Sequence, residues 1–316
     1  LEQSKLLIKA AAKAGADAVK FQMVYADELS TVDYKHYSLF KELEMSDAQW
    51  ESLKYYALSF GTKLIVDVFG VKSLKTAEKI NINTIKVHGT DVTNLGLLEA
   101  IAISPVKNVI LGLGGAYWAE IEKAIKILKY KDLILLCGFQ GYPTKTGDNH
   151  IARMHLIKEK VKSIHANFKM GYADHPENEK FASTICLIAV GAGAEVIEKH
   201  LTLGKVMEME DFESALNPDE FKHFIKQLQT GKKALGDIIK EENFGMSEAE
   251  KTYRENVRRD VVALKEILQG ETLSAQNITL KRTSNLNSIK QLELVLGKKT
   301  KNLIQKNQPL LTKDIN

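Results

Sequence analysis

Two short apolar segments each carry a lysine and, two positions further along, a second polar residue. Lys20 and Gln22 alternate in one segment, and Lys86 and His88 alternate in the other. In an extended strand, residues two positions apart point to the same face. A lysine within an apolar strand is costly to bury unless it meets an anion or a water-filled cavity. The pattern therefore favours anion binding over a solvated strand edge for Lys20 and Lys86.

A histidine closes each of two other apolar segments. His175 ends a run of glycine, tyrosine, alanine and aspartate, and His200 follows Glu198 and Lys199. If these segments are adjacent strands, they lie roughly 5 Å apart, and the two imidazoles can share one ion. On these residues alone, hydrogen-bonded histidines without a metal are an equally consistent interpretation. Asp174 is a candidate to orient one imidazole from behind.

The segments that carry these residues alternate with amphipathic segments of helical length. Short, nearly continuous apolar runs connected by helices are typical of a parallel sheet. We expect seven strands, at residues 18–23, 63–69, 84–88, 108–113, 132–137, 168–172 and 195–200. Helices are expected at residues 1–14, 46–59, 72–79, 95–103, 118–128, 151–161, 179–190 and 218–234.

These units predict a (β/α)8 TIM barrel. Residues 1–14 have the pattern of a helix with no strand before it, so we expect a first strand to precede Leu1. Seven visible units and one implied strand fill roughly the 250 residues typical of this fold, in which polar residues at the strand ends share one mouth. An open doubly wound sheet is the alternative, but no glycine-rich dinucleotide turn follows the first of these strands. The glycine cluster at residues 112–115 is more typical of a tight turn than of a phosphate cradle.

The composition changes after the barrel. Residues 240–259 are charged and contain too few apolar residues for a core element. Beyond them, short apolar pieces are separated by glycine, asparagine and proline, which predicts a compact β-rich module of about sixty residues. We therefore predict a barrel domain over residues 1–238, a linker over 239–256 and a small domain over 257–316.

The overall composition argues against several classes of protein. The 316 residues carry a formal net charge of +4 with lysines spread along the chain, so nucleic acid is not implied as a partner. The longest apolar runs are far shorter than the roughly 20 residues of a membrane-spanning helix. The two cysteines, Cys137 and Cys186, both lie in apolar runs, which favours free thiols in a reducing cytoplasm over a disulfide.

In these motifs the chain resembles the sialic acid synthase (N-acetylneuraminate synthase) family nearly from end to end. Residues 14–22 are very close to that family's signature around Lys20, and shorter matches follow in order at residues 142–144, 171–175, 198–203 and 258–263. The resemblance implies a TIM barrel followed by an antifreeze-like (SAF) domain. It also implies a transferase that condenses phosphoenolpyruvate with an N-acetylated, ManNAc-like hexose, giving a nonulosonic 2-keto sugar acid for surface glycans.

The resemblance implies roles for the residues named above. His175 and His200 match ligands of a divalent metal, usually Mn²⁺ with Mg²⁺ or Co²⁺ as alternatives, which would polarise the sugar aldehyde and orient the attacking water. Lys20 and Lys86 match the lysines that hold the phosphate and carboxylate of phosphoenolpyruvate. We count Asp174 with these two lysines as a candidate catalytic residue.

The substrate-binding residues and the partner follow from the same resemblance. Arg282 matches an arginine that the SAF domain inserts into the partner subunit's site, so a domain-swapped homodimer is expected. The remaining candidate substrate-binding residues are Gln22, Asp67, Gln140, Tyr142 and Asp211.

The chain departs from the family pattern where the donor's phosphate would bind. Asp67 stands where a small hydroxyl residue is usual, and Gly89 and Ala173 stand where serines are usual. Gln140 replaces an asparagine, and residues 209–212 lack a histidine of the family pattern. Losing three hydroxyl donors and gaining a carboxylate weakens phosphate binding by several kcal/mol if nothing compensates, since each charge-assisted hydrogen bond contributes about 1.5–3 kcal/mol.

Three functions are consistent with this sequence. The first is the metal-dependent condensation described above. The second is an aldolase or lyase that acts on a 2-keto sugar acid through a Schiff base on Lys86 or Lys20, because a desolvated lysine can become nucleophilic. The third is a sugar-binding paralogue without catalysis, against which the retained lysines and histidines argue.

Overall fold

The computed structural model describes residues 1–138, 141–236 and 245–316. These residues form two compact units, Leu1–Gly236 and Asp237–Asn316. Within the described part of the chain, no helix is both long and apolar enough to cross a membrane.

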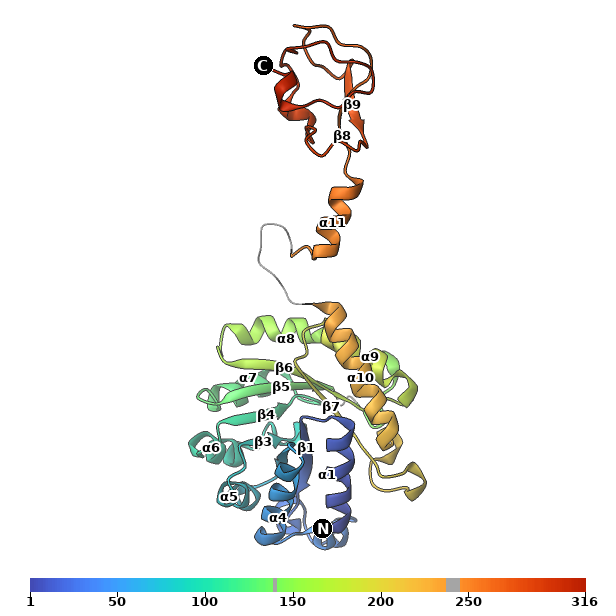
Figure 1. Cartoon of the computed structure of the whole chain (residues 1–316). Helices are drawn as coiled ribbons and strands as arrows, with labels where there is room; N and C mark the ends of the chain where they lie inside the picture. Colours follow the sequence, from blue (N-terminus) through green and yellow to red (C-terminus); the bar gives the residue numbers. More distant parts are fainter. Residues whose placement is uncertain (139–140, 237–244) are drawn as a thin grey trace. The chain divides into compact units, whose positions relative to one another are not determined.

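The first unit is built on a parallel sheet of seven strands that pair in chain order (Figure 1). All seven expected strands are present, with ends that differ from expectation by no more than two residues. The register sets Asp67 opposite both Gln22 and Lys86. The strands are β1 (Ala18–Met23), β2 (Lys63–Val68), β3 (Thr84–Val87), β4 (Asn108–Gly112), β5 (Asp132–Gly138), β6 (Phe168–Asp174) and β7 (Val196–Lys199).

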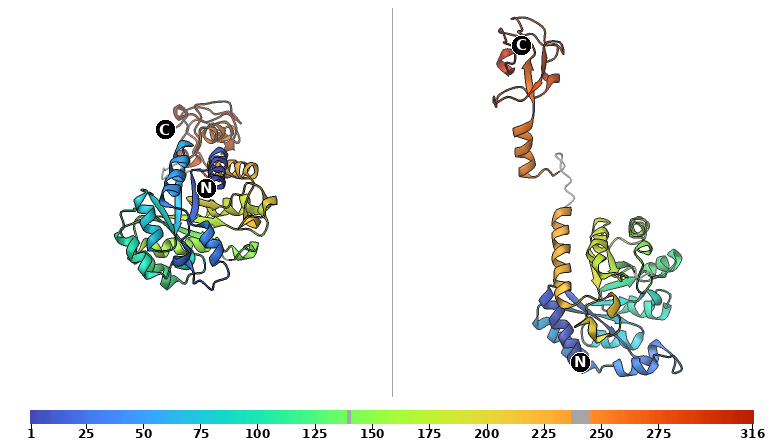
Figure 2. Two further views of the ribbon diagram at one scale, coloured as in Figure 1. Left: turned by 90° about the horizontal axis from the view of Figure 1, so that it is seen from below. Right: turned by 90° about the vertical axis from the view of Figure 1, so that its right-hand side faces the viewer.

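Helices cover the outer face of this curled sheet (Figures 1 and 2). Helix α1 packs against both α10 and α4. The short helices α2 and α3, which the sequence pattern did not predict, lie in the connection between β1 and α4. The helices are α1 (Glu2–Ala14), α2 (Ala26–Leu29), α3 (Tyr37–Leu43), α4 (Asp47–Ser59), α5 (Val71–Lys79), α6 (Leu95–Ile103), α7 (Trp118–Ile127), α8 (Arg153–Lys162), α9 (Ala182–Gly191) and α10 (Pro218–Leu235).

Two apolar clusters hold the sheet in place. The larger lies between the strands and the surrounding helices and includes the fully buried Trp50, Leu53 and Ile85. A smaller cluster of Ile110, Leu136 and Ala173 packs with Ile65 and Ile134 inside the sheet's curve. Strands buried on both faces explain the nearly continuous apolar runs in the sequence.

The expected (β/α)8-type architecture is confirmed, and the described residues supply seven of its strands. Among them the sheet runs from β1 to β7 without a hydrogen bond that joins β7 to β1. Parallel strands with outer helices place the carboxyl ends of all seven strands at one mouth. Single turns of 3-10 helix follow several strands, at Gly89–Asp91, Thr146–Asp148, Glu179–Phe181, Lys205–Met207 and Phe212–Ser214.

The second unit contains helix α11 (Glu248–Val257) and an antiparallel pair, β8 (Asp260–Ala263) with β9 (Ile278–Lys281). Isolated bridges and turns at Leu292–Leu294 and Thr312–Asp314 complete it around its own apolar core. All of helix α11 except its last residue lies in the predicted linker. The helix begins at a capping box of Ser247 and Glu250 and has no buried residue. Charged residues at helical spacing therefore form an exposed helix there.

Candidate active site

A cavity of about 180 Å³ lies at the carboxyl ends of the strands. It is the place where most of the predicted site residues meet. Gln140 lies outside the described residues, and Arg282 belongs to the second unit, where its Nε donates to the Val257 carbonyl at 3.3 Å. The predicted residues that line the cavity are Lys20, Gln22, Asp67, Lys86, Tyr142, His175, His200 and Asp211.

A chain of ion pairs crosses the cavity. Asp67 Oδ2 lies 3.0 Å from Lys20 Nζ and 3.7 Å from Lys86 Nζ. Lys86 also pairs with Glu198 Oε1 at 2.7 Å. The last contact joins β3 to β7, which are far apart in the order of the sheet, so it forms only because the sheet curls. The lysines therefore face into the mouth as predicted, and each meets a carboxylate there.

These contacts fix the charges of the cavity. Burial alone would raise the pKa of the Glu198 carboxyl, but Lys20 and Lys86 outweigh it and lower that pKa to about 2. Burial alone would lower the pKa of Lys20, but the charges of Asp67 and Glu198 outweigh it and raise the pKa above its ordinary value. At neutral pH the cavity therefore contains an ammonium on Lys20 and a carboxylate on Glu198.

The two candidate metal ligands lie side by side. The rings of His175 and His200 have centroids 5.0 Å apart, and the ring of Tyr142 lies 5.9 Å and 6.3 Å from them. Burial lowers the pKa of His175 to about 4. Burial, with His175 and Lys20 nearby, lowers the pKa of His200 to about 3. Both imidazoles are therefore neutral at physiological pH, which is the form that binds a metal.

This donor set suits a metal ion with open coordination positions. Asp211 Oδ2 lies 3.8 Å from His200 Nδ1, too far for the two to share a hydrogen bond. Within residues 1–138, 141–236 and 245–316, no group of three histidine, cysteine or acidic side chains is placed to hold a metal. Two neutral imidazoles fit as two ligands of a divalent ion, and water and substrate would have to supply the others.

Asp174 is not brought together with the other candidates. Successive residues in a strand point to opposite faces, so Ala173 and His175 face the cavity while Asp174 faces the helices. Its carboxylate is fully buried and pairs with Lys199 Nζ at 2.7 Å. Burial raises the pKa of Asp174, although Lys199 opposes that shift. The expected contact with an imidazole is therefore replaced by a structural ion pair between β6 and β7.

Two cavity residues were not assigned a role from the sequence. Glu198 holds the ammonium of Lys86, and His88 lines the cavity beside it. The sequence contained a signal for Glu198, because it lies two positions before His200 and so shares its face of the strand. The signal for His88 was of the same kind, because His88 lies two positions after Lys86 and so shares its face of the strand. Burial lowers the pKa of His88, so this third imidazole is neutral in the mouth.

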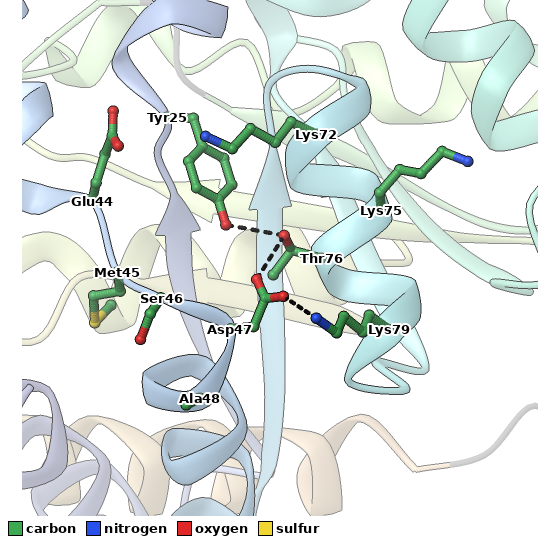
Figure 3. Close-up of a pocket in the computed structure, with 10 residues that line it drawn as sticks. All are labelled: Tyr25, Glu44, Met45, Ser46, Asp47, Ala48, Lys72, Lys75, Thr76 and Lys79. Carbon is green, nitrogen blue, oxygen red and sulfur yellow. Dashed lines mark hydrogen bonds and ion pairs between the residues drawn. The ribbon is translucent and has the colours of Figure 1, made fainter.

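A second hollow, of about 820 Å³, lies between the start of α4 and helix α5 (Figure 3). Four of its polar side chains, those of Tyr25, Asp47, Thr76 and Lys79, are bonded to one another. Thr76 bonds both Tyr25 and Asp47, and Asp47 also holds Lys79 at 2.6 Å. The Lys72 ammonium lies 3.9 Å from the centroid of the Tyr25 ring. This hollow therefore contains a surface network, and the convergent charges and neutral imidazoles are found in the smaller cavity.

The family of the chain follows from its sequence over most of its length. Residues 7–240 match the NeuB family, and residues 258–316 match the SAF domain. The chain belongs to the NeuB family. The expected resemblance to sialic acid synthases with a carboxyl-terminal SAF domain is thereby confirmed. As a NeuB-family synthase, the chain is a carbon–carbon bond-forming enzyme, as expected.

Individual relatives span nearly the whole chain. An uncharacterized protein of Methanocaldococcus jannaschii is 35% identical over 96% of this chain and 86% of its own length. The N,N'-diacetyllegionaminic acid synthase of Campylobacter jejuni is 32% identical over 94% of this chain and 91% of its own length. The crystal structure of an N-acetylneuraminic acid synthetase from Leptospira borgpetersenii, 29% identical, covers 81% of this NeuB-family chain and 87% of that chain with a TM-score of 0.72.

Proposed function

We propose that this NeuB-family chain condenses phosphoenolpyruvate with an N-acetylated hexose of the ManNAc class, in a metal-dependent reaction that makes a nonulosonic 2-keto sugar acid for surface glycans. The observation that carries the proposal is one cavity in which two adjacent neutral imidazoles face two lysine ammoniums. Relatives named as legionaminic, pseudaminic and sialic acid synthases support it.

The reaction joins three components. The C3 carbon of phosphoenolpyruvate forms a bond to the aldehyde carbon of the open-chain sugar, and the aldehyde oxygen becomes a hydroxyl by taking a proton. Water adds at C2, and inorganic phosphate leaves as the 2-keto group forms. A divalent ion held by His175 and His200, proposed to be Mn²⁺, would act as the Lewis acid for the aldehyde oxygen.

The side chains of the cavity bind and orient the substrates in this proposal. Lys20 and Lys86 hold the anionic groups of the donor, and Glu198 fixes the position of Lys86. Gln22 and Asp211 lie on the same lining and are suited to hydrogen bonds with sugar hydroxyls. Positioning the two substrates in one small cavity supplies the entropic part of the rate enhancement.

Two features complete the proposal. Arg282 of the SAF domain is proposed to enter the partner subunit's site within a domain-swapped homodimer, and Gln140 is proposed to contact substrate. Cys137 and Cys186 are free and buried, in keeping with the proposed cytoplasmic location.

The Schiff-base alternative is not favoured. A lysine that forms a Schiff base needs a depressed pKa, so that the free amine is available. The pKa of Lys20 is instead raised by Asp67 and Glu198. Lys86 is held between the carboxylates of Asp67 and Glu198. Neither amine is therefore free to attack a carbonyl carbon.

The test is turnover under defined conditions. The protein is incubated without oxygen with Mn²⁺, phosphoenolpyruvate and a panel of N-acetylated hexoses, and both phosphate release and the 2-keto acid product are measured. Phosphate release that depends on one sugar and stops on chelation is the expected result. No release with any sugar of the panel contradicts the proposal.

A matched pair of variants separates metal binding from general damage. His175→Ala removes one imidazole of the cavity, whereas His155→Ala removes an exposed imidazole from α8. We expect the first to lose Mn²⁺ binding and turnover and the second to retain both. Equal turnover in the two variants would show that His175 does not hold the metal.

A further inference from the structure

The third imidazole of the cavity, that of His88, lies directly beyond the end of β3. Strand β3 ends at Val87, and His88 continues its extended backbone with a φ of −65° and a ψ of 153°. Residues two positions apart on an extended backbone point to the same face, and both Lys86 and His88 line the cavity. The proposed function assigns Lys86 to the anionic groups of the donor and gives His88 no role.

The contacts of the His88 ring assign its proton to Nε2. The Thr90 backbone N–H can only donate, and its nitrogen lies 3.4 Å from His88 Nδ1. The Thr90 hydroxyl lies 2.9 Å from the same ring nitrogen and 3.4 Å from Asp91 Oδ2, so its nearer acceptor is Nδ1. A neutral imidazole has one donor and one acceptor nitrogen. Because Nδ1 accepts, Nε2 carries the proton, and Nε2 lies farther from the main chain than Nδ1 does.

We propose that His88 is a substrate-binding residue whose Nε2–H donates a hydrogen bond to the phosphate of phosphoenolpyruvate beside Lys86. The inference rests on the proposed function for the identity and the place of the donor. It gives His88 the part that a hydroxyl would play at this strand end, where Gly89 supplies no side chain. A hydrogen bond to an ionised phosphate oxygen is stronger than one between two neutral groups.

The backbone around His88 explains why the donor comes from position 88. Gly89, Gly112 and Gly114 line the cavity without side chains. A Cβ at Gly89 would lie 2.6 Å from the Gly114 carbonyl oxygen, and a Cβ at Gly112 would lie 2.8 Å from the Gly89 nitrogen. A serine hydroxyl therefore has no room at position 89 unless the backbone moves. The imidazole enters from one residue earlier, and the glycines add no side chain that would fill the space beside it.

The charged groups of the lining leave a place for a neutral donor. The carboxyls belong to Asp67, Glu198 and Asp211, and the ammoniums belong to Lys20 and Lys86. Both ammoniums already meet carboxylates, so a phosphate has to share them. Burial lowers the pKa of His88, so its imidazole is uncharged. A neutral N–H donates to phosphate without an ion pair having to be broken first.

The other neutral side-chain donors that the structure describes in the lining lie elsewhere. Gln22 belongs to β1, two strands from β3 in the order of the sheet. Tyr142 lies beside the two candidate metal ligands, with its ring centroid 5.9 Å from that of His175. Of these donors, His88 is the one that shares a strand end with Lys86. It is therefore the side chain best placed to bind the same phosphate as that lysine.

The first experiment measures binding of phosphoenolpyruvate, inorganic phosphate and pyruvate by calorimetry with the full-length, Mn²⁺-loaded protein. His88→Phe keeps a ring beside Phe69, whose centroid lies 6.3 Å from that of His88, but removes the donor. His88→Gln returns an N–H near the place of Nε2. His155→Phe is the matched control, because it makes the same replacement at an exposed position of α8.

We expect His88→Phe to bind phosphoenolpyruvate and inorganic phosphate at least about tenfold more weakly than the wild type, which corresponds to about 1.4 kcal/mol. Pyruvate has no phosphate, so its binding should change by less than about threefold. His88→Gln should recover most of the lost affinity, and His155→Phe should stay within about threefold of the wild type for all three ligands. Unchanged phosphoenolpyruvate binding by folded His88→Phe, or an equal loss for pyruvate, overturns the inference.

A measurement on the unaltered protein covers the case in which the His88 variants do not fold. NMR of the ring nitrogens distinguishes the two neutral tautomers of histidine, and it is applied to the metal-free, full-length protein with and without inorganic phosphate. We expect His88 in the Nε2–H form, with an Nε2 signal that shifts when phosphate is added. An Nδ1–H tautomer, or no shift at saturating phosphate, overturns the inference.

The two proposals fail in different ways. Anion binding needs no turnover, so weaker phosphate binding by His88→Phe without product from any sugar would leave this inference standing and count against the proposed function. Product formation by the wild type, together with unchanged phosphoenolpyruvate binding by His88→Phe, would have the opposite meaning. A wild type that binds neither phosphoenolpyruvate nor inorganic phosphate contradicts both proposals.

Discussion

Replacing Asp174 by asparagine tests whether this residue supports the fold or takes part in catalysis. Asp174 and Lys199 are 0% and 1% exposed and lie 2.7 Å apart. Removing one partner of a buried ion pair leaves an uncompensated charge and costs about 3–5 kcal/mol. The total free energy of unfolding of a typical domain is about 5–15 kcal/mol. We therefore expect Asp174→Asn to lose a large fraction of the stability of the barrel.

Urea unfolding followed by circular dichroism measures the effect. With a slope of about 3 kcal/mol per molar urea, a loss of 3–5 kcal/mol lowers the midpoint by about 1–1.7 M. The double variant Asp174→Leu with Lys199→Met removes both charges at once. Replacing a buried pair by apolar residues of similar volume is often neutral or stabilising. We expect the double variant to recover most of the stability that the single variant loses.

The same samples are assayed for Mn²⁺ binding and phosphate release below the unfolding transition. A structural ion pair leaves metal affinity per folded molecule nearly unchanged, because Asp174 faces away from the cavity. A single variant as stable as the wild type that has nevertheless lost Mn²⁺ binding would refute this reasoning and restore Asp174 as the residue that orients an imidazole.

Three further predictions concern the cavity and strand β5 beside it. The pKa values of His175 and His200 in the folded protein, about 4 and about 3, lie below the ordinary value of 6.5, so between these limits the unfolded chain binds more protons than the folded one. The free energy of unfolding of the metal-free protein should therefore fall as the pH drops below about 6.5, by up to about 1.4 kcal/mol per pH unit for each imidazole. Urea unfolding at several pH values measures this loss. Gly138→Ala should fold poorly, because Gly138 has a φ of 101° and a Cβ there would lie 2.0 Å from a carbonyl oxygen of β6. The control Gly141→Ala should unfold at nearly the wild-type temperature, because its Cβ would meet only a carbonyl oxygen at 3.7 Å. Equal melting temperatures of the two variants would contradict this prediction. Cys137 is buried and burial raises its pKa to about 12, so iodoacetamide should modify it only on unfolding, and mass spectrometry showing rapid labelling of the folded protein would contradict the buried placement.

The sequence predicted the strands and the mouth for a physical reason. A strand covered on both faces must be apolar along its length, so polar residues stand out where it ends. Lys20, Lys86, His175 and His200 were found by that contrast, and all four line the cavity. Asp174 was judged from its neighbours in sequence, although alternation places it on the opposite face from His175.

Other features could not be read from the sequence. The contact of Lys86 with Glu198 joins residues 112 positions apart, and it depends on how far the sheet curls. The contact of Asp67 with both lysines depends on register, which sets Asp67 opposite Lys86 and Gln22. Local composition also gave no sign that the charged segment after the barrel forms helix α11, since none of its residues is buried.

The charge balance of the cavity indicates that binding of an anionic donor at Lys20 and Lys86 is coupled to binding of a metal at His175 and His200. Lys20 and Lys86 are matched by the carboxylates of Asp67 and Glu198, and Asp211 adds a third carboxyl to the lining, so the side chains of the cavity have no excess positive charge. His175 and His200 are neutral and add none. An anionic donor therefore gains little electrostatic attraction from the side chains alone. In the proposed function a divalent ion on His175 and His200 would add positive charge to the same cavity, so donor and metal should each increase the other's affinity by the same factor.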